Sequence, residues 1–171
     1  MTTKRLNLYI LSILLLAITV RVYAVLSHPT TPVADAADYH RLATGLVQGR
    51  GYVNIAGRST AWRPPAYPAF LAGIYTVFGV NVTAATVVQA LLGGLTVLML
   101  MALGAVILDW PRALIASAIA AVYPVLIWLP RLLLSENVSL FLLLLTLTAV
   151  VLGWLGTRGI FPRPVLRERV G

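Results

Sequence analysis

Long apolar stretches alternate with short polar segments along this chain. Four of these stretches are long enough to cross a bilayer as helices, which takes about 17–25 residues each. They cover residues 6–26, 82–108, 113–129 and 132–155. Pro124 interrupts the third stretch, where it should kink or end the helix because proline has no N–H to donate. The pattern predicts four transmembrane helices.

The first apolar stretch has a second interpretation, as a cleaved signal peptide with Val22 and Ala24 at the cleavage site. The length of the stretch favours a retained anchor. Arg21, near its outer end, is expected to extend its guanidinium to the membrane interface.

Residues 27–81 separate the first two stretches and contain two shorter patterns of helical period. In residues 35–48 the apolar side chains share one face with Asp35 and Tyr39, and in residues 65–78 aromatic and aliphatic residues recur at helical spacing. We expect two amphipathic helices that lie on the membrane surface, with an irregular segment between them. The fold class is therefore all-α, a single polytopic membrane domain.

Composition agrees with this class, because 60% of the 171 residues are hydrophobic and 11% are charged. The chain has no cysteine, which excludes disulfides and thiolate metal sites. The net charge of +8 comes from arginines scattered among the membrane segments, a pattern that fits lipid headgroups or a phosphate ligand and not nucleic acid.

Charge also predicts the orientation in the membrane. The short loops and the tail at 156–171 carry basic residues that would all lie on one side: Lys4, Arg5, Arg112, Arg158, Arg163, Arg167 and Arg169. The positive-inside rule places both termini in the cytoplasm and residues 27–81 outside. The localisation expected is the plasma membrane.

Two carboxylates stand out in a chain with five acidic residues. Asp35 could be a simple helix N-cap, with Asp38 in the first turn favoured by the helix dipole, yet Asp35 falls on the apolar face. Glu136 lies in a polar break at the outer end of the fourth stretch, where it could be solvated or pair with Arg131. The functional alternative is a cavity that Asp35 and Glu136 share.

Three arginines, Arg58, Arg63 and Arg131, fall at the same outer boundary. Each alone could contact headgroups. Together they offer guanidinium groups suited to a phosphate, with a carboxylate base nearby.

The order of motifs resembles a known family. It runs from Asp35-x-x-x-Tyr39 through "LATGLVQGRGY" (42–52) and "TAWRPPAYPAFLAGIYTVFG" (60–79) to "VVQALLGG" (87–94) and "LLLSEN" (132–137). This order is similar to the N-terminal part of the C-type membrane glycosyltransferases, glycosyltransferase family 39, near the protein mannosyltransferases and aminoarabinose transferases.

The resemblance implies a transferase that takes a sugar from a polyprenyl-phosphate carrier at the external face and inverts the anomeric centre. Asp35 matches the catalytic base of the family. Arg58, Arg63, Arg131, Glu136 and Tyr39 would contact the substrate and its phosphate. A divalent cation on Asp35 and Glu136 is possible in principle, but Trp62 and Ala36 replace acidic residues of related sequences, which counts against it.

Family members continue through further membrane helices, so we expect the chain to need a second chain or to be inactive alone. The alternative to an enzyme is a non-enzymatic membrane component, such as a transporter subunit or assembly partner. Transporters place ionisable groups near the bilayer midplane, whereas here the polar groups gather at one boundary.

Overall fold

A computed structural model describes residues 2–157. Within this range the regular elements are all helical, apart from one isolated bridge between Val53 and Ser59. The elements are α1 Thr3–Ser27, α2 Asp35–Val47, α3 Ala66–Phe78, α4 Val82–Ile107, α5 Trp110–Val122, α6 Pro124–Trp128, the short 3-10 turn η1 Leu129–Arg131 and α7 Glu136–Thr157. The all-α class is confirmed. The predicted tail at 156–171 lies outside the described residues from position 158 on.

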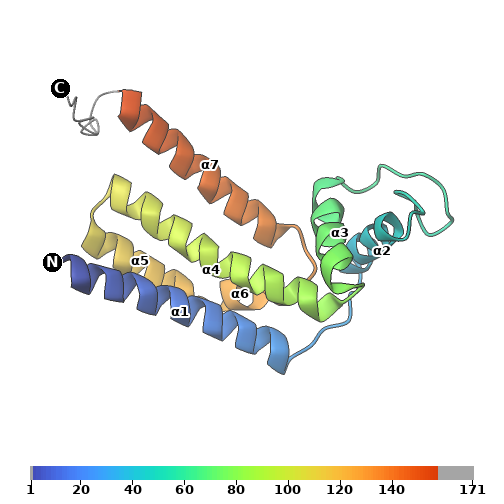
Figure 1. The fold of residues 1–171 in the computed structure, drawn as a ribbon, viewed down its shortest axis with the longest axis horizontal. Coiled ribbons are helices and arrows are strands. Elements are labelled where there is room, and N and C mark those ends of the chain that lie inside the picture. The colour runs from blue at the N-terminus through green and yellow to red at the C-terminus, as the bar shows by residue number, and fades with distance from the viewer. Residues whose placement is uncertain (1, 158–171) are drawn as a thin grey trace, which may run out of the picture.

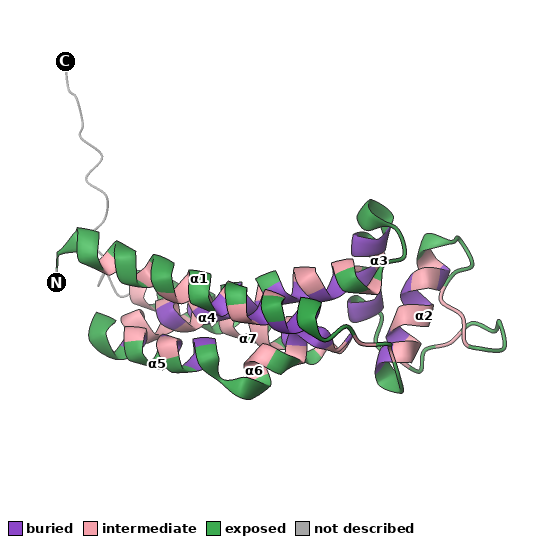
Figure 2. Ribbon diagram, turned by 90° about the horizontal axis from the view of Figure 1, so that it is seen from below, coloured by how far each residue is buried: buried purple, intermediate pink, exposed green. Residues whose placement is uncertain are grey.

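The long helices form one bundle, and the two short helices sit at its end (Figure 1). Helix α4 contacts α1, α5 and α7, while α7 leans away from the other helices toward its C-terminal end. Helices α2 and α3 pack against each other where α1 ends and α4 begins. Figure 2 shows the buried residues along α4 and on α2 and α3.

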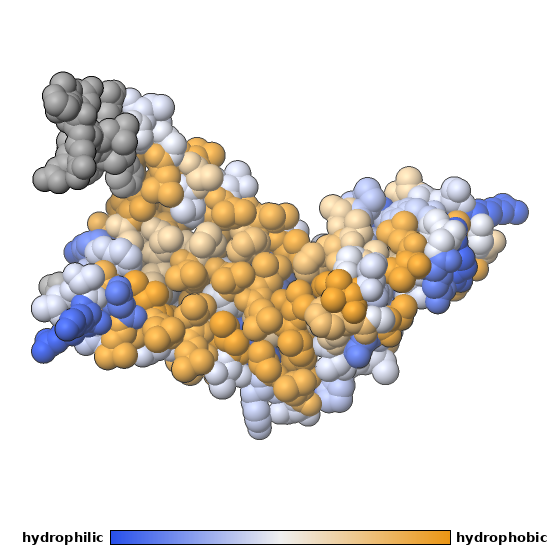
Figure 3. All heavy atoms as spheres, viewed as in Figure 1, coloured by the Kyte–Doolittle hydropathy of each residue, from blue (hydrophilic) through white to orange (hydrophobic). Residues whose placement is uncertain are grey.

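The bundle has an apolar surface with hydrophilic residues gathered at its two ends (Figure 3). Three of the described helices, α1, α4 and α7, are each long and apolar enough to cross a membrane. Helix α5 and the segment Pro124–Arg131 meet the same criterion only together, with a bend of 56° between them. The protein is therefore a multi-pass membrane protein with three spans, or four if the bent pair is one span.

Pro124 accounts for the bend. It has no N–H for the carbonyl of Ala120, so the helical ladder stops at Val122 and restarts as α6. The sequence predicted this interruption. It did not predict that residues 132–135 would be non-helical, so that α7 begins at Glu136 instead of Leu132.

The expectation for Arg21 was wrong. Its guanidinium does not reach the interface but is buried, with 1% of the residue exposed. It donates to the carbonyls of Ala17 and Ala121, both at 2.9 Å, and of Ala120 at 3.1 Å. The break at Pro124 removes the i+4 donor of the Ala120 carbonyl, which keeps only a 3.4 Å bond from the Tyr123 N–H, so carbonyls at the end of α5 are open to a buried cation.

The apolar face of α2 was expected to meet the membrane, and instead it packs on α3. Ala36, Tyr39 and Ala43 of α2 form a buried cluster with α3 residues that include Leu71 and Tyr75. An amphipathic helix buries its apolar stripe against a neighbouring element, and for α2 that element is α3. The pair therefore stands as one unit at the end of the bundle.

Candidate functional site

Arg63 joins the two aspartates that open α2. Its guanidinium donates to Asp35 Oδ1 and, at 3.2 Å, to Asp38 Oδ2. Arg41, one turn along the helix, donates to the other oxygen of Asp38 at 2.7 Å. The hydrogen bond to Asp35 is the main cause that raises the pKa of Arg63. The four side chains form a charge-balanced cluster at the surface.

Asp35 does not cap α2, in contrast to one interpretation of the sequence. It is the first helical residue, Ala34 occupies the cap position, and no side chain caps the helix. Ala34 has φ of 49°, a region uncommon for residues with a side chain. This turn leaves the Asp35 side chain 57% exposed and directed to Arg63. The carboxylate is thus accessible and charge-paired, and it is not buried in the apolar face.

Two tyrosines hold Arg63 in place. The Tyr52 hydroxyl donates to the Arg63 carbonyl at 2.9 Å, which fixes the irregular segment before α3. The Arg63 guanidinium carbon lies 5.5 Å from the centre of the Tyr39 ring, within the range of cation–π attraction. Tyr39 in turn meets Tyr67 edge to face, with the ring centres 4.9 Å apart. Tyr39 therefore lies between Arg63 and Tyr67 and contacts both side chains.

A buried polar network anchors this unit to the membrane helices. The Tyr67 hydroxyl donates to Gln89 Oε1 at 3.0 Å, and Gln89 Nε2 donates to the carbonyls of Pro130 (3.3 Å) and Leu132 (3.0 Å). Asn137 Nδ2 donates to the Gln89 carbonyl at 2.8 Å. Burial raises the pKa of Tyr67, so its hydroxyl stays a donor. The network ties α3, α4, η1 and α7 together and holds the Leu132 carbonyl, in the non-helical segment 132–135.

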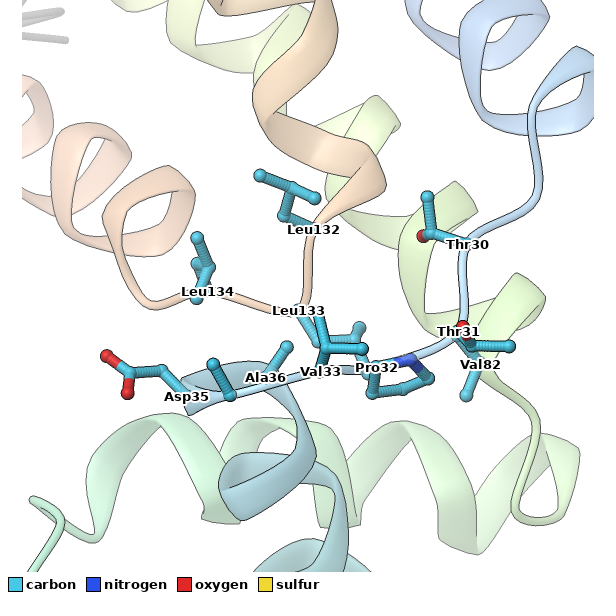
Figure 4. Close-up of a pocket in the computed structure, with 11 residues that line it drawn as sticks. Thr30, Thr31, Pro32, Val33, Asp35, Ala36, Val82, Leu132, Leu133 and Leu134 are labelled. Carbon is cyan, nitrogen blue, oxygen red and sulfur yellow. The ribbon is translucent and has the colours of Figure 1, made fainter.

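An apolar cavity of about 300 Å³ opens beside Asp35. Its lining comes from the segment before α2, the start of α4 and the segment before α7: Thr30, Thr31, Pro32, Val33, Ala34, Asp35, Ala36, Val82, Leu132, Leu133 and Leu134. In Figure 4 the Asp35 carboxylate lies at one end of this lining, past Leu134, while Thr31 and Val82 lie at the other end. We call it the apolar cavity. Its lining is mostly hydrophobic and ends at the carboxylate of Asp35.

A second cavity, of about 460 Å³, lies at the other aspartate and has a mixed lining, more polar than that of the apolar cavity. Asp38, Arg41 and Leu42 of α2 line it, with Asn54, Ile55, Thr60, Trp62 and Arg63 of the segment between α2 and α3. We call it the polar cavity. The Arg63 side chain lines it and also reaches Asp35, so the ion pairs connect the two cavities.

Two of the predicted arginines do not join Arg63. Arg58 is exposed in the segment between α2 and α3, where its backbone pairs with Asn54. Arg131 is buried, donates to the His28 carbonyl from Nε (3.0 Å) and an Nη (2.6 Å), and stacks at 3.5 Å on the Trp128 ring. Arg131 thus hydrogen-bonds the residue that follows the C-terminal end of α1.

Glu136 does not share a cavity with Asp35. It is exposed at the start of α7 and is absent from the lining of the apolar cavity. The structure gives it no ion pair with Arg131, whose donors face His28. Its charge acts at longer range, as one of the causes that raise the pKa of Tyr67.

The side chains do not fit a divalent cation on Asp35 and Glu136. Among the described residues, no three His, Asp or Glu side chains converge as metal ligands. Asp35 and Asp38 are each engaged by Arg63. The side chains present form a guanidinium–carboxylate cluster.

Sequence reasoning missed part of the site. Asp38 was interpreted as a dipole-favoured residue, and it is indeed in the first turn of α2, but it also pairs with two arginines. Nothing in the sequence indicated that Asn54 lines the polar cavity, and Trp62 was expected only to replace an acidic residue of related sequences. The three-residue spacing of Asp38 and Arg41 is a signal for an ion pair along one helix, and it was available in the sequence.

Comparison with known proteins identifies one matching family. No curated protein matches the chain, and no solved structure does. The sequence model of the dolichyl-phosphate-mannose-protein mannosyltransferase family matches residues 62–159, more than half of the chain. The match includes Arg63 and the α3–α7 scaffold, and Asp35 and Asp38 lie before it. This apolar, multi-pass chain, with its membrane-boundary cluster of arginine and aspartate, belongs to the dolichyl-phosphate-mannose-protein mannosyltransferase family.

Proposed function

We propose that the protein transfers a sugar from a polyprenyl-phosphate carrier to an acceptor hydroxyl at the external face of the membrane, with Asp35 as the catalytic base. Membership of the family makes it a membrane glycosyltransferase and implies a lipid-linked sugar donor. The observation that carries the finer proposal is the position of Asp35, at the end of an apolar cavity and in contact with Arg63.

The two halves of such a donor match the two sides of Asp35. The polyprenyl chain is apolar and suits the apolar cavity, whose lining includes Val33, Val82 and three consecutive leucines, 132–134. The phosphate suits the forked guanidinium of Arg63, which carries a full positive charge and several N–H donors. A donor bound in this way would present its anomeric carbon close to Asp35.

Arg63 would link donor binding to the activity of the base. Without a donor its N–H groups are engaged by Asp35 and Asp38. When a phosphate arrives, those N–H groups turn to the phosphate oxygens, and the Asp35 carboxylate becomes free to accept a proton. The acceptor oxygen then attacks the anomeric carbon, its proton passes to Asp35, and the bond to the phosphate oxygen breaks with inversion. Arg63 stabilises the departing phosphate.

The topology proposed with this mechanism puts both termini in the cytoplasm. Helices α2 and α3 stand at one end of the bundle, and the start of α1 and the α4–α5 turn stand at the other (Figure 1). Lys4, Arg5 and Arg112 belong to that other end, which the positive-inside rule assigns to the cytoplasm. The cluster would then face the external leaflet of the plasma membrane.

The test is Asp35→Asn in the full chain, expressed in cells that lack the native copy. The readout is transfer of labelled sugar from a polyprenyl-phosphate donor in isolated membranes. Loss of a general base should lower transfer by about 10²–10⁴-fold.

Asp109→Asn is the control, because Asp109 pairs with Arg112 at the α4–α5 turn, at the other end of the bundle, and the variant should retain most of the activity. Melting temperatures of both purified variants show whether the fold is intact. If a folded Asp35→Asn variant transferred sugar at the wild-type rate, Asp35 would not be the base.

A further inference from the structure

We infer that the polar cavity binds a saccharide as the acceptor, with Trp62 as its stacking surface. This inference rests on the proposed transferase function and adds the chemical class of the second substrate. The name of the family points to protein acceptors, so a saccharide is a different expectation for this chain.

Trp62 is the first observation. Trp62 lines the polar cavity and is 79% exposed, so little of its surface is buried against the rest of the protein. The backbone N–H of Trp62 donates to Thr60 Oγ1 at 3.2 Å, which fixes the backbone that carries the ring. The indole itself is open to solvent, and the C–H face of a pyranose ring is a suitable partner for an exposed aromatic face.

The second observation is the set of polar groups around that indole. Asn54 Oδ1 already accepts from the N–H groups of Ala56 (2.9 Å) and Arg58 (3.0 Å), so its NH₂ group is the part left to donate. Arg41 and Arg63 contribute planar guanidinium groups, and Asp38 contributes acceptor oxygens. Planar donors and acceptors around an aromatic face match the neighbouring hydroxyls of a sugar.

Size and position are the third observation. The cavity volume of about 460 Å³ falls within the range of about 300–1,000 Å³ typical of small-ligand sites. A neighbouring cavity of about 370 Å³ shares Arg41 and Asn54 with it, which leaves room for a second sugar unit. Because Arg63 spans from this cavity to Asp35, a hydroxyl bound here would be directed toward the base.

A peptide acceptor fits this surface less well. Extended peptides bind by adding a strand to an exposed edge or by laying a helix into an apolar groove. Within residues 2–157 the only isolated bridge pairs Val53 with Ser59, and neither of these residues lines the polar cavity. Asp38, Arg41 and Asn54 are among the polar residues that this cavity offers to a sugar.

The experiment measures binding to the full chain in lipid nanodiscs by saturation-transfer NMR. The probes are a panel of methyl glycosides, with the N-acetylated, C-amidated tripeptide Ala-Thr-Ala as the peptide probe. We expect transfer to at least one glycoside and none to the peptide. Trp62→Ala should weaken the glycoside signal at least tenfold, and Trp62→Phe should retain part of it.

Trp110→Ala is the control, because Trp110 is also exposed but opens α5 at the other end of the bundle. Binding of a polyprenyl phosphate, measured in parallel, should be equal in wild type and Trp62→Ala. Binding of the peptide in place of the glycosides, no binding of any glycoside, or glycoside binding that Trp62→Ala leaves unchanged would each overturn the inference. None of these results would affect the test of Asp35, which measures donor turnover.

Discussion

The guanidinium of Arg63 donates a hydrogen bond to the carboxylate of Asp35, although 28 residues separate them in the chain. The family match begins one residue before Arg63, and Asp35 lies outside it. This ion pair therefore connects the part of the chain that matches the family to the residue that we propose as the base. It also implies that the base is occupied until a competing anion arrives.

Replacement of Arg63 by lysine should separate charge from geometry. Lysine keeps the positive charge but lacks the planar fork that reaches two carboxylates or a phosphate. The loss of a charge-assisted hydrogen bond, about 1.5–3 kcal/mol, corresponds to about 10–100-fold in kcat/KM for the lipid-linked donor. Steady-state transfer assays in membranes measure this.

Arg58→Lys is the matched control for that substitution, because Arg58 belongs to the same segment and its side chain is exposed. It should keep a donor kcat/KM close to wild type. Equal losses in the two variants would show that general positive charge, and not the Arg63 fork, serves the donor.

Arg21 and Pro124 should be energetically coupled. Arg21→Met removes the donors to the Ala120 and Ala121 carbonyls and should lower the free energy of unfolding by about 1–3 kcal/mol. Pro124→Ala restores an N–H at the break, so the double variant should lose less than the two single variants added together, by about 0.5 kcal/mol or more.

Unfolding of the four proteins in mixed micelles measures this coupling. Simple additivity of the two substitutions would contradict the assignment of Arg21 as the partner of the carbonyls at the break. Leu95→Ala, on an exposed side of α4, serves as a control that should add independently to Arg21→Met.

His40 should make the packing of α2 on α3 sensitive to pH. Its Nδ1 lies 2.8 Å from the Tyr75 hydroxyl, and burial lowers its pKa below the ordinary value of 6.5. The unfolded chain therefore takes up the proton first, so the stabilisation is complete above pH 6.5 and declines as the pH falls through the lowered pKa. The melting temperature should fall by a few degrees between pH 7.5 and 5.5.

His40→Gln should remove most of this pH dependence, and His28→Gln, at the end of α1, should leave it in place. Thermal melts of the three proteins in nanodiscs at several pH values provide the comparison. A wild-type melting temperature that stays constant or rises on acidification would contradict the prediction.

Local patterns were enough to predict the helices. Asp35–Val47 and Ala66–Phe78 match the helical spacing in the sequence, and the break at Pro124 follows from the chemistry of proline. The start of α7 was not predictable in this way. Leu132, Leu133 and Leu134 are as apolar as the helix that follows, but they lie outside it, and the Gln89 side chain, far away in the chain, donates to the Leu132 carbonyl.

The sequence by itself determined that this protein is an all-helical membrane protein of a glycosyltransferase family, because apolar length, helical period and motif order are properties of neighbouring residues. Only the tertiary structure decided which charges meet. It brought Arg63 to Asp35 and Asp38, buried Arg21 against the broken helix, and kept Arg131 and Glu136 away from the cluster. Side-chain partners depend on how α2 and α3 pack at the end of the bundle, and no local pattern encodes that geometry.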